Sequence, residues 1–121
     1  MMKKIWKLFA RQRESVTPAE AKLALASGAV LVDVREQSEW QAGHAADAVH
    51  IPLGQISKRL GELPTDRQLI LVCRSGHRSG IAVNVLSSNG IKATNLTGGM
   101  NAWTAAGLPT VNSGEPRDHS A

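Results

Sequence analysis

Two short apolar runs constrain the fold of this 121-residue chain more than any other feature. Residues 29–34 read Ala-Val-Leu-Val-Asp-Val, and residues 69–72 read Leu-Ile-Leu-Val. Continuous apolar sequence, without polar alternation, is typical of strands that are buried on both faces of a parallel sheet. Helix-like segments follow both runs, so strands and helices alternate, which favours a mainly parallel sheet with right-handed crossovers. A chain of this length is expected to form one α/β domain with a single core.

Helix start and stop signals place the other elements around these strands. Thr17 is expected to cap a helix that begins at Pro18, with Glu20 completing a capping box, and Gly28 is expected to end it. Helical spacing of apolar residues or short β-branched stretches mark the remaining elements. We expect helices over residues 35–41, 53–63, 81–89 and 100–106, and short strands over residues 49–51 and 93–96.

Three polar residues near the predicted strands each have a structural and a functional interpretation. For Asp33, pairing with a nearby arginine or with loop N–H groups is favoured over a role as catalytic acid or base. His44 and His50 have no further ligand at a spacing that favours a metal, so structural roles are favoured for both. The single cysteine excludes an internal disulfide and a cysteine-rich zinc site. We therefore expect no metal and no cofactor.

The net charge of +4 comes from one end of the chain. The first 14 residues hold five lysines and arginines against Glu14, which leaves nine basic and nine acidic residues in the remainder. A neutral body with 3% aromatic residues has neither the basic patch nor the stacking surface of a nucleic-acid-binding protein. We therefore expect no nucleic-acid partner.

Both ends are predicted to lie outside the folded domain, which we place at residues 15–109. Residues 1–14 form a basic amphipathic extension, for which a frayed terminus is favoured over weak contact with a membrane surface or partner, or docking on its own domain. Residues 110–121 lack apolar periodicity and are predicted to be a disordered tail. No stretch approaches the roughly 18 apolar residues that span a bilayer, and the start does not resemble a secretory signal, so we expect a cytoplasmic protein.

The chemistry is predicted to centre on the polar stretch after the second apolar run, Cys73-Arg74-Ser75-Gly76-His77-Arg78-Ser79. Open α/β sheets bind ligands at the carboxyl ends of their strands, where loop N–H groups and the next helix dipole stabilise anions. A hydrogen bond to a charged group contributes about 1.5–3 kcal/mol, and one pKa unit is about 1.4 kcal/mol. Two or three such bonds would lower the pKa of Cys73 by about two units or more, which favours a reactive thiolate over a buried, inert thiol.

Several short motifs follow one another in a fixed order. They are Asp33-Val34-Arg35-Glu36 with Glu39-Trp40, Gly43-His44, the segment Val49–Pro52, the loop Cys73–Ser79, and Leu96-Thr97-Gly98-Gly99 with Ala102-Trp103. Together they make the chain resemble the single-domain rhodaneses, a thiosulfate sulfurtransferase-like family. The resemblance implies a three-layer α/β/α sandwich around a mainly parallel five-stranded sheet. It also implies that Cys73 takes up a sulfane sulfur as a persulfide and passes it on. One departure is Ala45-Ala46-Asp47, where the family usually has a bulky apolar residue followed by proline and glycine.

The residue types of the loop also fit sulfur transfer. Thiosulfate, the donor that the family name suggests, is a small dianion, for which Arg74 and Arg78 offer charge and Ser75 and Ser79 offer hydroxyl groups. Gly76 and His77 complete the predicted substrate-binding set, although an exposed loop position without a chemical role is favoured for His77. The expected partners are this small anionic donor and a thiol, a protein sulfur acceptor or cyanide.

Two other functions are compatible with the same architecture. The active-site loops of phosphatases and arsenate reductases with this architecture resemble the pattern of a cysteine, five further residues and then an arginine. In this chain only four residues separate Cys73 from Arg78. The shorter loop makes a smaller cradle, which favours one extra sulfur over a phosphoryl group. A non-enzymatic interaction module would be marked most simply by loss of the nucleophile, and Cys73 is present.

Overall fold

The computed structural model describes residues 15–112, which form a five-stranded sheet covered by helices. The strands are β1 (Ser15–Val16), β2 (Val30–Asp33), β3 (Val49–His50), β4 (Leu69–Val72) and β5 (Thr94–Leu96). Every pairing is parallel, and the strand order is β1-β5-β4-β2-β3. The predicted α/β class and five-stranded parallel sheet are therefore confirmed.

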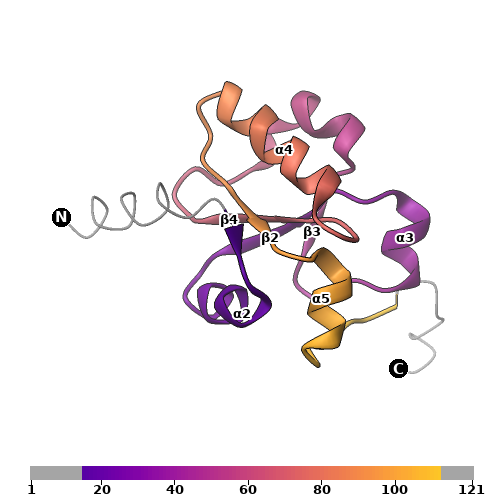
Figure 1. Ribbon diagram of the computed structural model, residues 1–121. Coiled ribbons are helices and arrows are strands. Elements are labelled where there is room, and N and C mark those ends of the chain that lie inside the picture. The colour runs from indigo at the N-terminus through magenta and orange to yellow at the C-terminus, as the bar shows by residue number, and fades with distance from the viewer. Residues whose placement is uncertain (1–14, 113–121) are drawn as a thin grey trace, which may run out of the picture.

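Helices cover both faces of the sheet. They are α2 (Pro18–Ala26), α3 (Gln37–Ala42), α4 (His77–Ser88), α5 (Gly99–Ala105) and the 3-10 helices η1 (Leu53–Lys58) and η2 (Leu60–Glu62). Figure 1 shows α4 on one side of the sheet, α2 and α5 on the other, and α3 beside the sheet. Each side has its own apolar cluster, so the molecule has three layers.

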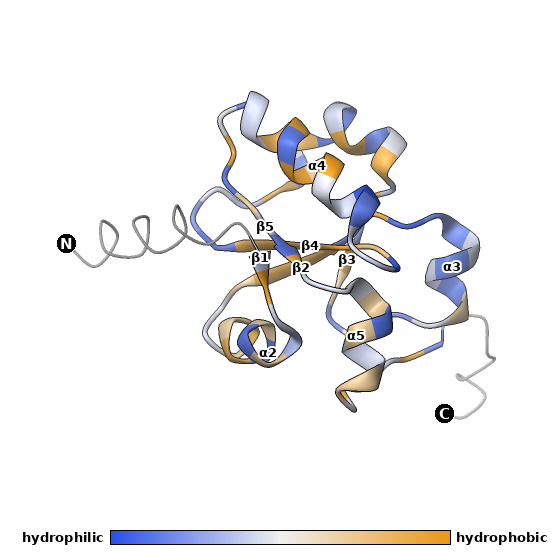
Figure 2. Cartoon of the chain, viewed as in Figure 1, coloured by the Kyte–Doolittle hydropathy of each residue, from blue (hydrophilic) through white to orange (hydrophobic). Residues whose placement is uncertain are grey.

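The central strand β4 explains the continuous apolar run that predicted it. Leu69 and Leu71 belong to the cluster on the α4 side, whereas Ile70 and Val72 belong to the cluster on the side of α2 and α5. All four are buried, and Figure 2 shows the hydrophobic colouring of the sheet between the two helical layers. Successive side chains of a strand point to opposite faces, so a strand covered on both faces needs apolar residues at every position.

The strand order opens a crevice at the carboxyl ends of β2 and β4. These strands are neighbours, with Asp33 opposite Val72. The chain leaves β2 toward β3 on one flank and leaves β4 toward β5 on the other. Where successive connections depart in opposite directions, ligands of open α/β sheets bind between the strand ends. Cys73 follows β4 directly and so lies at this point.

Most local predictions were correct in type, and several were wrong in their boundaries. Thr17 and Glu20 form the expected capping box at the start of α2. Helix α4 begins at His77 and not at residue 81, so part of the predicted loop is the first helical turn. Residues 53–63 form two 3-10 helices in place of one α-helix, since Gly54 and Gly61 disfavour regular helix.

The described part of the chain extends slightly beyond the predicted domain. His44 and Val111 form an antiparallel bridge, with N–O distances of 2.9 and 2.7 Å, and this ties residues 110–112 of the predicted tail to the domain. The turn at Ala45-Ala46-Asp47 is closed by a 3.1 Å bond from the Ala48 N–H to the Ala45 carbonyl. The predictions for residues 1–14 and 113–121 lie outside the described residues. Among residues 15–112, no helix is long and apolar enough to cross a bilayer.

Candidate active site

The sulfur of Cys73 accepts hydrogen bonds from three donors. The N–H of Gly76 lies 3.1 Å from Sγ, the N–H of Ser79 lies 3.3 Å away, and the Ser79 hydroxyl also lies 3.3 Å away. Gly76 has a left-handed φ of 112°, which glycine adopts at little cost, and this lets the chain turn directly into α4. The loop and the first turn of α4 therefore surround one sulfur atom with donors, as an anion site requires.

Burial disfavours ionisation of this thiol, but the effect of the hydrogen bonds on its pKa is larger than that of burial. Desolvation raises the pKa of Cys73, whereas the Ser79 hydroxyl and the N–H groups of Ser79, Gly76 and Ser75 lower it. The resulting pKa lies below the ordinary value of a cysteine. The site therefore favours a thiolate, the nucleophilic form of the side chain.

Asn95 of β5 holds two parts of the sulfur site. Its Oδ1 lies 2.6 Å from the Ser79 hydroxyl oxygen, and its Nδ2 donates to the Gly76 carbonyl at 2.9 Å. The Ser79 hydroxyl has a single proton, so Asn95 and the Cys73 sulfur compete for it. Asn95 thus positions Gly76 and limits how strongly Ser79 donates to the sulfur.

The start of α5 fixes the other side of the loop. The N–H of Met100 donates to the Cys73 carbonyl at 2.8 Å, and the N–H of Asn101 donates to the Arg74 carbonyl at 3.1 Å. Gly99 packs directly against these carbonyls: a Cβ at this position would come within 2.4 Å of both oxygens. Gly99 also has a φ of 58°, so both space and backbone conformation require glycine here.

Arg78 is engaged in an ion pair and does not point freely at the sulfur site. Its Nη1 and Nη2 donate to Oε1 and Oε2 of Glu39 at 2.7 and 2.8 Å. This bond pattern lowers the pKa of Glu39 to about 2, with a smaller contribution from the Glu36 N–H at 3.0 Å. Glu39 is therefore ionised throughout the neutral range, and α3 is joined to the start of α4.

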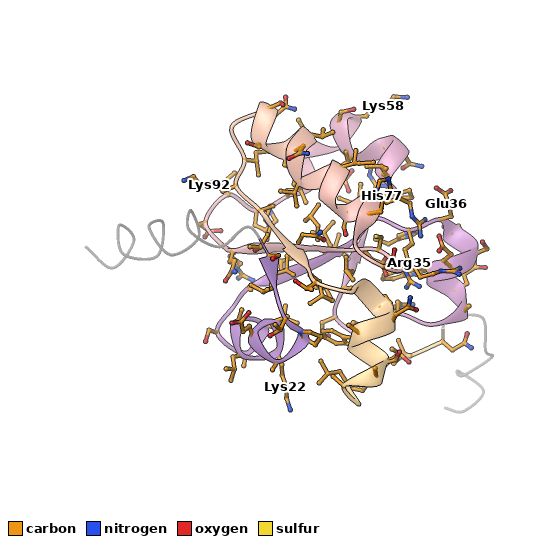
Figure 3. The ribbon with its side chains drawn as sticks, in the orientation of Figure 1. Lys22, Arg35, Glu36, Lys58, His77 and Lys92 are labelled. Carbon is orange, nitrogen blue, oxygen red and sulfur yellow. The ribbon has the colours of Figure 1, made fainter. Side chains whose placement is uncertain are left out.

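The other predicted loop residues lie at the rim of the site. Arg74 is 64% exposed at its side chain and reaches Glu39 only through a 3.4 Å contact. Ser75 and His77 are exposed, and Figure 3 shows the His77 side chain at the start of α4. The structure thus brings Gly76 and Ser79 to the sulfur, pairs Arg78 with Glu39, and leaves Arg74, Ser75 and His77 toward solvent.

Asp33 has the structural role that was favoured for it. The buried carboxylate accepts bonds from Nε and Nη2 of Arg35 at 2.9 and 2.7 Å, and from the Arg35 N–H at 3.0 Å. Arg35 in turn donates to the Gly43 carbonyl at 2.7 Å. This pair holds the chain where it leaves β2, beside the loop after β4.

The two histidines also have structural partners. Trp40 stacks on His44 and His50, with ring centroids 3.5 and 4.6 Å apart. A ring nitrogen of His44 lies 2.7 Å from the Trp40 carbonyl, and one of His50 lies 2.7 Å from the Arg35 carbonyl. Residues 15–112 contain no group of three or more His, Cys, Asp or Glu side chains that could hold a metal.

The family model of the rhodanese-like domain matches residues 17–106, which is most of the chain. The chain belongs to the rhodanese-like family. A sulfurtransferase of Allochromatium vinosum is 40% identical over 91 residues, covering 74% of this chain and 85% of that protein. The crystal structure of a rhodanese-related protein from Thermoplasma volcanium superposes with a TM-score of 0.76 at 28% identity, covering 81% of this chain and 97% of that one.

A longer relative contains the same rhodanese-like region. The HTH-type transcriptional regulator Rv0324 of Mycobacterium tuberculosis is 38% identical over 109 residues, which is 88% of this chain and 48% of that protein. The chain therefore spans about half the length of this relative. Together with the sulfurtransferase-named relative, the family match supports a sulfurtransferase-like role for this rhodanese-like domain.

Three residues that shape the site were not predicted as site residues. Glu39 and Gly99 belong to the motifs that carry the family resemblance, but a motif does not say which side chains they contact. Asn95 had a weak signal, since it is a polar residue within a short strand that is otherwise buried. Their contacts join α3, β5 and α5 to the Cys73 loop, so only the tertiary structure could show them.

Proposed function

We propose that this rhodanese-like domain is a sulfurtransferase in which Cys73 carries a sulfane sulfur as a persulfide. The observation that carries the proposal is the Cys73 sulfur with its three donors, two of them backbone N–H groups that no side-chain change removes. The only cysteine of the chain is thus the one placed where a thiolate is stabilised. A reducing compartment such as the cytoplasm would keep this single thiol available.

The reaction consists of two sulfur transfers. The Cys73 thiolate attacks the outer sulfur of the donor; with thiosulfate, the donor S–S bond breaks and sulfite leaves with the bonding electron pair. The product is a Cys73 persulfide, whose terminal sulfur is anionic. A thiol or cyanide then attacks that terminal sulfur and regenerates the Cys73 thiolate. Both steps exchange one nucleophile for another at sulfur, so no external oxidant or reductant is needed.

The N–H groups around the sulfur support both steps. They are fixed by the backbone of the loop and of α4, so they stabilise negative charge without reorganising. Ser79 adds a donor that can turn between the sulfur and Asn95 as the charge on the sulfur changes. Positive charge at the rim comes from Arg74, which is mostly exposed.

Phosphoryl transfer is the less supported alternative. Four residues separate Cys73 from Arg78, and the Arg78 guanidinium is occupied by the Glu39 carboxylate. A phosphate dianion would have to displace that carboxylate and approach its negative charge. These features favour sulfur transfer, although the sheet architecture fits both chemistries.

Steady-state kinetics with thiosulfate and cyanide test the proposal. Because sulfite leaves before the acceptor binds, the rate should follow ping-pong kinetics, with parallel lines in double-reciprocal plots. The Cys73→Ser variant should be folded and should form no thiocyanate above the uncatalysed background. Turnover of Cys73→Ser at the wild-type rate would refute the assigned nucleophile.

A further inference from the structure

The charges around the sulfur site are more balanced than the loop sequence indicates. Arg74 and Arg78 are the two cations of the loop, and the Glu39 carboxylate contacts both. Arg78 is also under the electrostatic influence of Glu36, at the start of α3. Figure 3 shows the labelled side chains of Glu36 and His77 where α3 faces the start of α4. Two carboxylates therefore oppose two guanidinium groups beside the nucleophile.

The pairing of Arg78 with Glu39 occupies the guanidinium nitrogens that a substrate anion would use. It uses both carboxylate oxygens and both terminal guanidinium nitrogens, the geometry that also binds a free anion most tightly. The Glu39 side chain is only 17% exposed, so water screens its charge less than that of a surface carboxylate. A small dianion that approaches the sulfur must either displace this carboxylate or react in its presence.

We propose that Glu39 is a specificity-determining residue that makes the site prefer sulfane donors of low negative charge over dianionic donors. This inference rests on the proposed sulfur transfer and specifies its donor class: organic thiosulfonates and persulfides, with thiosulfate as a poorer donor. The Glu39 carboxylate repels a donor in proportion to the donor's negative charge, so a monoanion experiences about half the repulsion that a dianion does. The chemistry at the sulfur is the same in both cases, because either donor offers one sulfane sulfur to the Cys73 thiolate.

Thiosulfate and methanethiosulfonate form a matched pair of donors for the test. Each gives its outer sulfur to Cys73 with cleavage of one S–S bond; sulfite leaves from the first and methanesulfinate from the second. They differ by one negative charge and by a methyl group in place of an oxygen. The ratio of kcat/KM for thiosulfate to kcat/KM for methanethiosulfonate, with cyanide as common acceptor, therefore reports the charge preference of the site.

Glu39→Gln removes the charge and keeps the size of the side chain. We expect the ratio to rise by about threefold to tenfold, the effect of one unit charge acting across a partly exposed site. Glu39→Asp keeps a carboxylate near the same place and should leave the ratio closer to that of the wild type. Glu62→Gln is the matched control: Glu62 forms a comparable ion pair with Arg59, on a 3-10 helix, and should leave the ratio unchanged.

The outcomes separate the inference from a purely structural role of Glu39. If Glu39 only joins α3 to α4, both Glu39 variants will lose activity with the two donors in equal proportion, and the ratio will stay constant. An unchanged ratio in an active Glu39→Gln protein overturns the inference alone. A wild-type protein that takes sulfur from neither donor overturns the proposed function, and the inference with it.

A salt titration of the wild-type protein adds a test that needs no variant. Because the rim charges are balanced and salt weakens the repulsion of the dianion by Glu39, the donor ratio should stay level or rise, and should not fall, between about 20 and 200 mM salt. A ratio that falls steeply with salt would mean that an uncompensated cationic site attracts thiosulfate, and this would contradict the role assigned to Glu39.

Discussion

Replacing Ser79 by alanine removes one donor from the Cys73 sulfur and leaves the two backbone donors in place. The lost contact is the 3.3 Å hydroxyl bond; the Ser79 N–H, also at 3.3 Å, is kept by alanine. A hydrogen bond to a charged group contributes about 1.5–3 kcal/mol, which equals about one to two pKa units. The Ser79 hydroxyl shares its single proton with Asn95 Oδ1 at 2.6 Å, so we expect the lower end, a rise of about one unit in the pKa of Cys73.

The pH dependence of alkylation measures this pKa directly. The rate of reaction with iodoacetamide follows the thiolate fraction, so the midpoint of the rate against pH gives the pKa of Cys73. A higher pKa means less thiolate at a given pH, and the Ser79→Ala rate well below the midpoint should fall about tenfold per pKa unit. Ser88→Ala, an exposed serine at the other end of α4, is the control and should match the wild type. A Ser79→Ala midpoint at or below the wild-type value would refute our account of the thiolate.

Three further predictions concern the support of the site. Gly99→Ala places a Cβ against the Cys73 and Arg74 carbonyls, so it should displace the loop, lower the melting temperature by several degrees and abolish most sulfur transfer, as measured by thermal unfolding and thiocyanate formation. Arg78→Ala leaves Glu39 with the Glu36 N–H bond at 3.0 Å and the 3.4 Å contact to Arg74, so it should lower the free energy of unfolding by about 1–2 kcal/mol in urea titrations and slow the thiosulfate reaction roughly tenfold; unchanged values of both would contradict the pairing. Deleting residues 1–14 should leave the thiosulfate rate within about twofold, because every contact of the sulfur described here comes from the loop and α4; loss of activity on deletion would refute this domain boundary.

The order of elements around Cys73 could be predicted because it depends on local sequence. The apolar run of β4 is continuous since that strand is covered on both faces, and the polar loop follows it without a gap. The capping box at Thr17 was predictable for the same reason, because both partners lie within one helical turn. By contrast, β1 has two residues, too few for any periodicity, and only the family resemblance implied a fifth strand.

The contacts that set the chemistry of the site depend on packing between distant segments. Arg78 was expected to face the anionic donor, and that role stays a prediction; the structure adds that its guanidinium pairs with Glu39 of α3. Sequence could not show this pair, because it depends on where α3 packs against the start of α4. The same is true of Asn95, whose position beside Ser79 follows from the pairing of β5 with β4.

The central claim is that Cys73 itself carries the transferred sulfur, and the intact mass of the protein tests it most directly. Incubation with thiosulfate, followed by removal of the donor, should add one sulfur atom, about 32 Da, and cyanide should remove it. Cys73→Ser, the chain without its only cysteine, should gain no mass under the same conditions. A wild-type protein that gains no sulfur from either thiosulfate or methanethiosulfonate, or a Cys73→Ser protein that gains the same mass as the wild type, would contradict the account.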